Sequence, residues 1–365
     1  MNSNPLDRIT TPQAAVVLIN YMLGAGIFTL PRAAVDVVKT PDVWISVIIG
    51  GLLAMLAGVI MVKLAQQHPG KTFFQFSQDL VGRWLGRVLS FIAICYFFTI
   101  SAYELRAMVE VAKLFLLEGT PVWAITMAFM WVSLYLIIGG INPMARLYEI
   151  ILPITGIIFL LVTLMSFGIF ELDNLRPVLG EGIMPVLKGV KTTALTFAGI
   201  EIMLILLVFM KNPDKAVKVV LVGTTVPLIF YLFTVVMVIG GLSVDGVITR
   251  AWPTLDLVRS FEIKGLIFER FESLLLVIWI MQIFSTCSLT HYTAALGLAQ
   301  LFKKKIQPFM FGLVPVIFII SMFPKNILDL FTLGDMVSNA GLYLFGCMPL
   351  LLLMLSRWKK GKFGA

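Results

Sequence analysis

The sequence has little charge and few reactive side chains. Charged residues make up only 13% of its 365 residues, about half the share of a soluble globular domain, which excludes a soluble fold with a polar surface. Cys95, Cys287 and Cys347 each stand alone in an apolar run, so no pair has the spacing of a metal or redox site. The two histidines have no partners for a metal site or a nucleophilic triad. We therefore expect no metal, no cofactor and no enzymatic activity.

The chain is rich in long apolar runs, and hydrophobic residues make up 59% of it. A membrane-spanning helix needs about 20 predominantly apolar residues. The ten candidate runs are residues 14–30, 43–62, 88–117, 122–138, 150–170, 192–210, 217–241, 273–301, 306–323 and 330–356. The sequence thus predicts an all-α protein with ten transmembrane helices in a lipid bilayer.

The basic residues are distributed unevenly among the connections. An even number of spans places both termini on one side, and the connections on that side hold most of the Lys and Arg residues, including Arg83, Arg87 and the run 303–305. By the positive-inside rule both termini are cytoplasmic. Membrane topology therefore accounts for the net charge of +8, and no nucleic-acid partner is expected.

Three connections are long enough to hold small elements. The cytoplasmic connection 66–87 contains Phe73, Phe74, Phe76 and Trp84, a pattern that predicts an amphipathic helix at the membrane interface. The outer connections are 171–191 and 242–272, and the second has the mixed charge of a partly exposed helix.

The first apolar run contains Gly24, Ala25 and Gly26, followed by Pro31. Two glycines at mid-membrane depth weaken a helix, and proline removes a further backbone donor, so we expect the helix to be broken here. Close packing of neighbouring helices through small residues is the alternative interpretation.

The sixth run repeats the pattern about half a chain length later. Its central residues are Thr196, Phe197, Ala198, Gly199, Ile200 and Glu201. Interrupted first helices in the two halves of a chain are typical of inverted-repeat transporters, in which the breaks form a binding site near the bilayer midplane. We predict repeats over residues 10–170 and 184–357. The ligand site would include Gly24, Ala25, Gly26 and Ile27 together with the six central residues of the sixth run.

Several segments carry a family resemblance that covers nearly the whole chain. They are Gly-Ala-Gly-Ile-Phe at 24–28, Leu-Arg-Ala-Met at 105–108, Asn-Leu-Arg-Pro-Val-Leu-Gly-Glu-Gly at 174–182, Phe-Ala-Gly-Ile-Glu at 197–201 and Phe-Glu-Arg-Phe-Glu-Ser at 268–273. The first and fourth resemble signatures of the amino acid–polyamine–organocation transporter superfamily. The others resemble the B subunit of bacterial spore germinant receptors.

The resemblance implies a LeuT-like fold of five plus five helices and a role in recognising a small nutrient. It also implies an integral protein of the spore inner membrane that works beside an A subunit and a lipoprotein C subunit. An amino acid is favoured over a sugar, because the N-terminal end of a half-helix suits a carboxylate. The alternative functions are an amino acid permease working by alternating access and, less favoured, an ion channel.

Four further residues in the apolar runs complete the predicted site. Tyr96 and Ile100 would form one wall, and Ser285 and Thr286 another. Sodium binding by hydroxyls of the eighth span is one alternative, and hydroxyls bonded back to their own helix carbonyls are another.

Four charged residues within the spans need an explanation. Glu104 lies on the predicted pocket face of the third span. Glu201 either caps the exposed N–H groups at the helix break, or contacts a cationic ligand group or takes part in a proton relay through Glu104. Arg106 and Glu110, one helical turn apart, are expected to form an ion pair.

Overall fold

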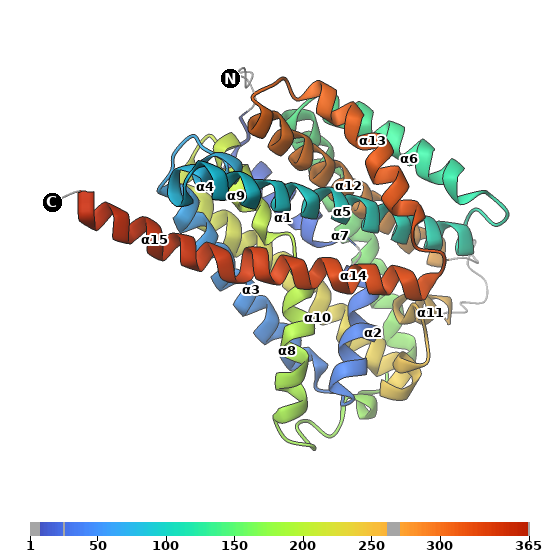
Figure 1. Cartoon of the computed structure of the whole chain (residues 1–365). Helices are drawn as coiled ribbons and strands as arrows, with labels where there is room; N and C mark the ends of the chain where they lie inside the picture. Colours follow the sequence, from blue (N-terminus) through green and yellow to red (C-terminus); the bar gives the residue numbers. More distant parts are fainter. Residues whose placement is uncertain (1–7, 25, 261–270, 364–365) are drawn as a thin grey trace.

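The structure of the protein is a computed structural model, which describes residues 8–24, 26–260 and 271–363. These residues fold into helices joined by short connections (Figure 1). The α-helices are α1 (Thr11–Met22), α2 (Gly26–Val38), α3 (Val43–Gln66), α4 (Phe73–Val81), α5 (Arg83–Phe115), α6 (Val122–Ile138), α7 (Ile141–Ser166), α8 (Met184–Thr196), α9 (Met203–Leu206), α10 (Ala216–Ile248), α11 (Pro253–Arg259), α12 (Phe271–Phe302), α13 (Gln307–Met322), α14 (Ile327–Gly341) and α15 (Met348–Phe363). Short 3₁₀ turns include η3 (Ile200–Ile202) and η4 (Leu207–Phe209), and a π-helical turn, η6 (Leu342–Cys347), joins α14 to α15.

Each predicted run overlaps an apolar helix or a bent pair of helices, although α7 begins at Ile141 and α8 at Met184, well before the predicted runs 150–170 and 192–210. Six of them are long and apolar enough to cross a membrane, and two bent pairs raise the number to eight. The bent pairs are α1 with α2, at 51°, and α8 with Ile200–Phe209, at 45°. The apolar helices α6 and α13 are shorter, with 17 and 16 residues. A typical membrane span has about 20. The all-α membrane fold is confirmed, and the count of ten spans stays a prediction.

Two groups of helices pack around the broken ones. Helices α2, α3, α8 and α10 contact one another in the lower part of Figure 1, and α5, α6, α12 and α13 do so in the upper part. Helix α1 contacts α10 from the first group and α12 from the second. The break that follows α1 therefore lies where the two groups meet.

A glycine permits a close approach of two helices in the second group. A Cβ atom on Gly297 of α12 would lie 2.6 Å from Cγ1 of Ile94 on α5. Because glycine lacks that atom, the backbones of α5 and α12 can lie against each other, as small residues allow in membrane proteins.

Helix α4 forms where the sequence predicts a helix, but its aromatic side chains differ from the expectation. Phe73, Phe74 and Phe76 are fully buried, and the centre of the Phe73 ring lies 6.1 Å from that of Phe345 in η6. These rings pack inside the protein because α4 is held against α5. Only Trp84 stays exposed, at 80%.

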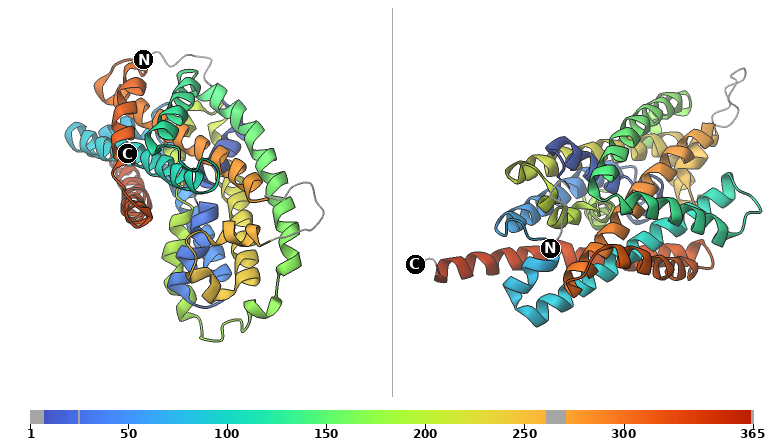
Figure 2. Two further views of the ribbon diagram at one scale, coloured as in Figure 1. Left: turned by 90° about the vertical axis from the view of Figure 1, so that its right-hand side faces the viewer. Right: turned by 90° about the horizontal axis from the view of Figure 1, so that it is seen from above.

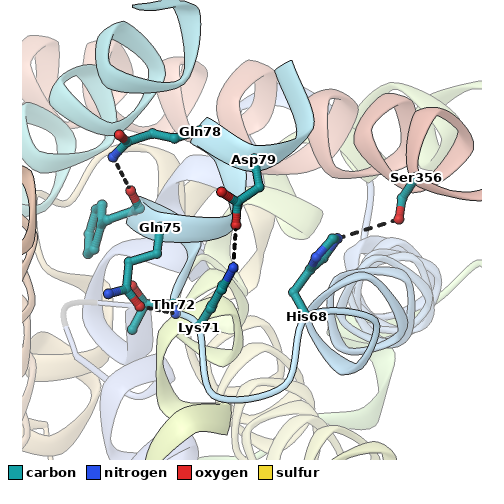
Figure 3. Close-up of polar contacts among 8 residues, drawn as sticks. His68, Lys71, Thr72, Gln75, Gln78, Asp79 and Ser356 are labelled. Atoms are coloured by element: carbon teal, nitrogen blue, oxygen red, sulfur yellow. Dashed lines mark hydrogen bonds and ion pairs between the residues drawn. The ribbon is translucent and has the colours of Figure 1, made fainter. Parts of the chain in front are cut away.

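Both ends of the described chain lie at the same end of the bundle. Ile9 donates to the carbonyl of Phe209 at 2.8 Å and accepts from the N–H of Lys211 at 2.9 Å. From the following loop, the carbonyl of Pro213 accepts a 3.0 Å hydrogen bond from Gln66, at the end of α3. His68 in turn lies 3.4 Å from the hydroxyl of Ser356 on α15 (Figure 3). Beyond this contact α15 projects from the bundle (Figure 2).

Candidate functional site

The two helix breaks are in direct contact. Gly199, which follows α8, adopts a φ of +124°, a conformation that glycine adopts without the steric cost of a side chain. A Cβ atom at this position would lie 3.2 Å from Cγ of Met22 and 3.3 Å from Cδ1 of Tyr21. Both of those residues belong to the last turn of α1. Gly199 thus satisfies a backbone requirement and a packing requirement at once.

Glu201 joins the two breaks through hydrogen bonds. Its side chain is buried, and Oε1 accepts from the hydroxyls of Tyr21 at 3.0 Å and Tyr96 at 3.1 Å. Its other oxygen, Oε2, accepts from the backbone N–H of Gly199 at 2.7 Å. The capping role expected of Glu201 is therefore present, because the carboxylate takes up an N–H group that the break exposes. Contact with a ligand stays a prediction.

Carbonyl groups at the breaks accept hydrogen bonds from two hydroxyls on neighbouring helices. Tyr231 of α10 donates to the carbonyl of Met22 and lies 3.4 Å from the carbonyl of Thr196. Thr286 of α12 lies 3.2 Å from the carbonyl of Tyr21. One tyrosine thereby contacts both breaks, and α12 is connected to the first.

Gly24 and Gly26 lie where side chains from other helices come closest to the first break. A Cβ atom on Gly24 would lie 2.7 Å from Oγ1 of Thr286 and 3.0 Å from Oε1 of Glu104. On Gly26 it would clash with the hydroxyl of Tyr231. Both glycines leave space for polar side chains of other helices. The motif therefore combines a helix break with close packing through small residues, the two interpretations given for it.

The other predicted site residues are divided between the breaks and their surroundings. Ile27 and Ile100 are buried, and the carbonyl of Ile27 accepts from Thr254 at 3.2 Å. Ser285 lies on another face of α12, where its carbonyl accepts from Tyr148 at 2.9 Å. Ala198 is exposed.

Two hydrophobic residues of the second break face α3 rather than the first break. A Cβ atom on Gly51 would lie 3.0 Å from Cζ of Phe197, and one on Gly58 would lie 2.6 Å from Cδ1 of Ile200. These side chains fill space against α3. Ala25 and residues 268–270 of the Phe-Glu-Arg-Phe-Glu-Ser segment lie outside the described residues.

Two further expectations concern polar groups inside the spans. Arg106 and Glu110 form the predicted ion pair, with 2.6 Å between Nη2 and Oε1. Ser288 and Thr290 of α12 bond back to carbonyls of their own helix, at 2.6 and 2.8 Å. Back-bonding is thus the observed arrangement for these hydroxyls, and no group of three or more His, Cys, Asp or Glu side chains suited to a metal occurs in the described part of the chain.

Tyr21 and Tyr231 contact the breaks but were not among the predicted site residues. Tyr21 stands three residues before Gly24, so its position beside an expected break was an available signal. Tyr231 occurs within an apolar run of α10 and carries no local sign of its contact with two distant carbonyls.

Comparison with known proteins assigns this chain to a family. A family model described as "Spore germination protein" matches residues 8–330. The chain belongs to this spore germination protein family. Spore germination protein YndE of Bacillus subtilis (strain 168) is 58% identical over 98% of both chains. Spore germination protein A2 of the same organism is 35% identical over 97% of this chain and 96% of its own.

Two solved structures have a fold similar to that of this chain. MhsT in complex with L-phenylalanine covers 94% of this chain and 88% of its own, with a TM-score of 0.72 and 9% identity. Mhp1, a nucleobase-cation-symport-1 family transporter with bromovinylhydantoin bound, covers 96% and 80%, with a TM-score of 0.68 and 15% identity. The LeuT-like fold is therefore confirmed, and this chain is a multi-pass membrane protein.

Proposed function

We propose that this chain is the nutrient-sensing subunit of a spore germinant receptor and that it binds a small amino acid between its two broken helices. It would lie in the spore inner membrane with both termini on the cytoplasmic side and would work with A and C subunits. Its role in this proposal is binding, without catalysis. Family membership supports the germination role, and the similarity to a fold solved with L-phenylalanine in MhsT supports the choice of an amino acid.

The observation that carries the proposal is the direct contact between the breaks. Gly199 packs on Tyr21, and Glu201 accepts hydrogen bonds from both sides of that contact. A ligand here would touch both halves of the chain. The N-terminal end of α2 favours a carboxylate, and the buried carboxyl groups of Glu104 and Glu201 favour an ammonium group, so a zwitterion matches both.

Signalling would follow from differential affinity. A ligand that binds one arrangement of the two helix groups more tightly shifts the population toward it. The described chain consists almost entirely of helices and short connections, so in this proposal the helix bundle itself would carry the change. Partner subunits would receive it at the membrane.

A thermal-shift screen of the purified protein against amino acids, sugars and nucleosides tests the proposal. A ligand present at 100 times its Kd stabilises the folded state by about 2.7 kcal/mol. We expect a response to one or more amino acids, reduced in Thr286→Val, which loses the hydroxyl beside Tyr21. Thr290→Val is the matched control, since that hydroxyl bonds within its own helix. A response to none of the three classes would refute the midplane site.

Uptake measurements separate a sensor from an amino acid permease. In liposomes carrying a proton or sodium gradient, we expect the protein to bind its ligand without accumulating it strongly. Gradient-driven uptake that disappears in Glu201→Gln would instead identify a permease. Ionic current across the liposome membrane would favour the channel alternative.

A further inference from the structure

A groove with a volume of about 650 Å³ lies between the start of α5 and the end of α12. Its lining includes Trp84, Arg87 and Phe91 from α5, Phe302 from the end of α12, and Lys303, which follows α12 directly. The volume is within the range of about 300–1,000 Å³ found for small-molecule sites. The groove lies at the end of both spans, where apolar helix gives way to basic connections.

The aromatic side chains of the groove are open to the surroundings. Trp84 is 80% exposed, Phe91 52% and Phe302 57%. The Phe302 ring stacks on Phe309 with 5.9 Å between the ring centres. In a membrane protein such rings at a helix end lie at the level of the lipid headgroups, where one edge contacts acyl chains and the other contacts water.

The two cations of the groove are available to a ligand. In the part of the chain that the structure describes, neither Arg87 nor Lys303 forms an ion pair with an acidic side chain. Asp79 of the neighbouring α4 is bound to Lys71, with 2.7 Å between Nζ and Oδ2 (Figure 3). The groove therefore carries an uncompensated positive charge, and the lining residues have further basic neighbours in the sequence, Arg83, Lys304 and Lys305.

The backbone conformation of Lys303 is unusual for a residue with a side chain. Lys303 follows α12 with a φ of +56°, and the N–H of Lys304 donates to the carbonyl of Ala299 at 2.9 Å. This is the helix-ending position at which glycine is preferred, because a side chain is strained in the left-handed region. A lysine there offers a charge that glycine lacks, either to the negative end of the helix or to a ligand.

We propose that this groove binds an anionic phospholipid of the adjacent leaflet. The guanidinium group of Arg87 and the ammonium group of Lys303 would bind the headgroup phosphate. The planar guanidinium can form paired hydrogen bonds to it. Phe91 and Phe302 would contact the upper part of the acyl chains, and Trp84 would lie at the glycerol level. The inference rests on the membrane fold and is independent of the nutrient proposed above.

Lipid retention measured by native mass spectrometry tests this site. The full chain would be purified in a neutral detergent and titrated with phosphatidylglycerol or phosphatidylcholine. Each basic residue near a membrane surface contributes a factor of about five in affinity for anionic lipid. We therefore expect selective retention of phosphatidylglycerol, weakened about 25-fold in the double variant Arg87→Gln with Lys303→Gln. The control variant Lys215→Gln with Lys218→Gln removes the same charge from the same end of the bundle and should bind normally.

Lys303→Gly separates ligand binding from a role in ending the helix. It removes the charge while relieving the left-handed strain, so we expect a thermal midpoint at least as high as that of the wild type in phosphatidylcholine, with affinity for phosphatidylglycerol about five-fold lower. Unchanged affinity in this variant would assign Lys303 to the helix end and overturn the proposal.

Inorganic phosphate distinguishes a lipid from a soluble anion. We expect millimolar phosphate to leave phosphatidylglycerol retention largely unchanged, because phosphate lacks the chains that contact Phe91 and Phe302. Complete displacement by phosphate, or equal retention of the two lipids, would contradict an anionic lipid site.

Discussion

The hydroxyl of Tyr21 donates a 3.0 Å hydrogen bond to Oε1 of Glu201, 180 residues further along the chain. The first residue lies at the end of α1, and the second lies in η3, just after the break that follows α8. The bond therefore connects the two interrupted helices directly. Tyr96 of α5 donates to the same oxygen, so a third helix is hydrogen-bonded to the place where the first two meet.

Removing these donors tests how strongly the breaks are held together. In Tyr21→Phe or Tyr96→Phe, Oε1 of Glu201 keeps one hydroxyl donor, and we expect each variant to lose about 1 kcal/mol of unfolding free energy. In the double variant a buried carboxylate oxygen loses both donors, so the loss should exceed the sum of the two single losses. Unfolding by sodium dodecyl sulfate in mixed micelles measures all three. Additive losses would show that the two hydroxyls act independently.

Tyr231→Phe tests the tyrosine that contacts both breaks. The ring packs edge-on against Phe197 and would remain, whereas the donor to the carbonyl of Met22 would be lost. We expect a loss of about 1–2 kcal/mol in the same unfolding measurement, since a buried carbonyl loses its donor. Tyr343→Phe, at a residue that is 67% exposed, is the control and should change little. A loss of equal size in both variants would argue against the bridging role.

Gly24→Ala tests the close approach at the first break. Its Cβ atom would lie 2.7 Å from Oγ1 of Thr286, and overpacking of this kind typically costs about 1–3 kcal/mol. Adding Thr286→Ala removes the clashing hydroxyl and should recover part of that loss. Gly156→Ala, with no atom within 4 Å of the added carbon, is the control. The idea fails if the second substitution recovers nothing and Gly24→Ala alone folds normally.

Asp256, on α11 outside the spans, provides a test by pH. Burial raises the pKa of its carboxyl group above the ordinary value, and Arg250 and Arg259 partly offset this effect. A raised pKa means that the folded state holds the proton more tightly than the unfolded state. The resulting stabilisation is present below about pH 3.9, the unfolded value, and is lost as the pH rises through the folded pKa. The stability of Asp256→Asn relative to the wild type should therefore increase with pH in this window.

The pH effect should be enlarged in a background that lacks Arg250. Its guanidinium nitrogen Nε lies 3.9 Å from Oδ2 of Asp256, and Arg250→Gln removes an offsetting positive charge. Thermal midpoints from pH 3.5 to 7 would measure the difference between the two backgrounds. A relative stability that falls with rising pH would show that the arginines outweigh the burial of Asp256.

The parts of the fold that could be predicted depend on local sequence. Apolar runs indicated the positions of the helices, and Gly24 and Gly199 indicated both breaks, because run length and glycine act on the backbone nearby. The capping contact of Glu201 was also accessible, since the acceptor and Gly199 are two residues apart. Arg106 and Glu110, one helical turn apart, were accessible for the same reason.

The remaining features depend on contacts between distant segments. The side chains of Phe197 and Ile200 face α3, which helical periodicity cannot indicate because the break interrupts the helix phase between them. Tyr231 meets Met22 across 209 residues of chain. The burial of the α4 phenylalanines follows from the packing of α4 on α5, whereas their sequence pattern suits a lipid interface equally well.

The π-helical turn η6 sets the rotational register of the C-terminal helix. A π turn holds one more residue than an α turn, and each residue of an α-helix advances the direction of the side chains by about 100°. Deleting one residue from Leu342–Cys347 would return the turn to α-helical geometry, and because the residue removed is the extra one of the π turn, α15 would keep its direction and Ser356 would still face His68. Deleting one residue between Met348 and Ser356, where the helix holds no extra residue, would instead rotate the rest of α15 by that angle and turn Ser356 away from His68.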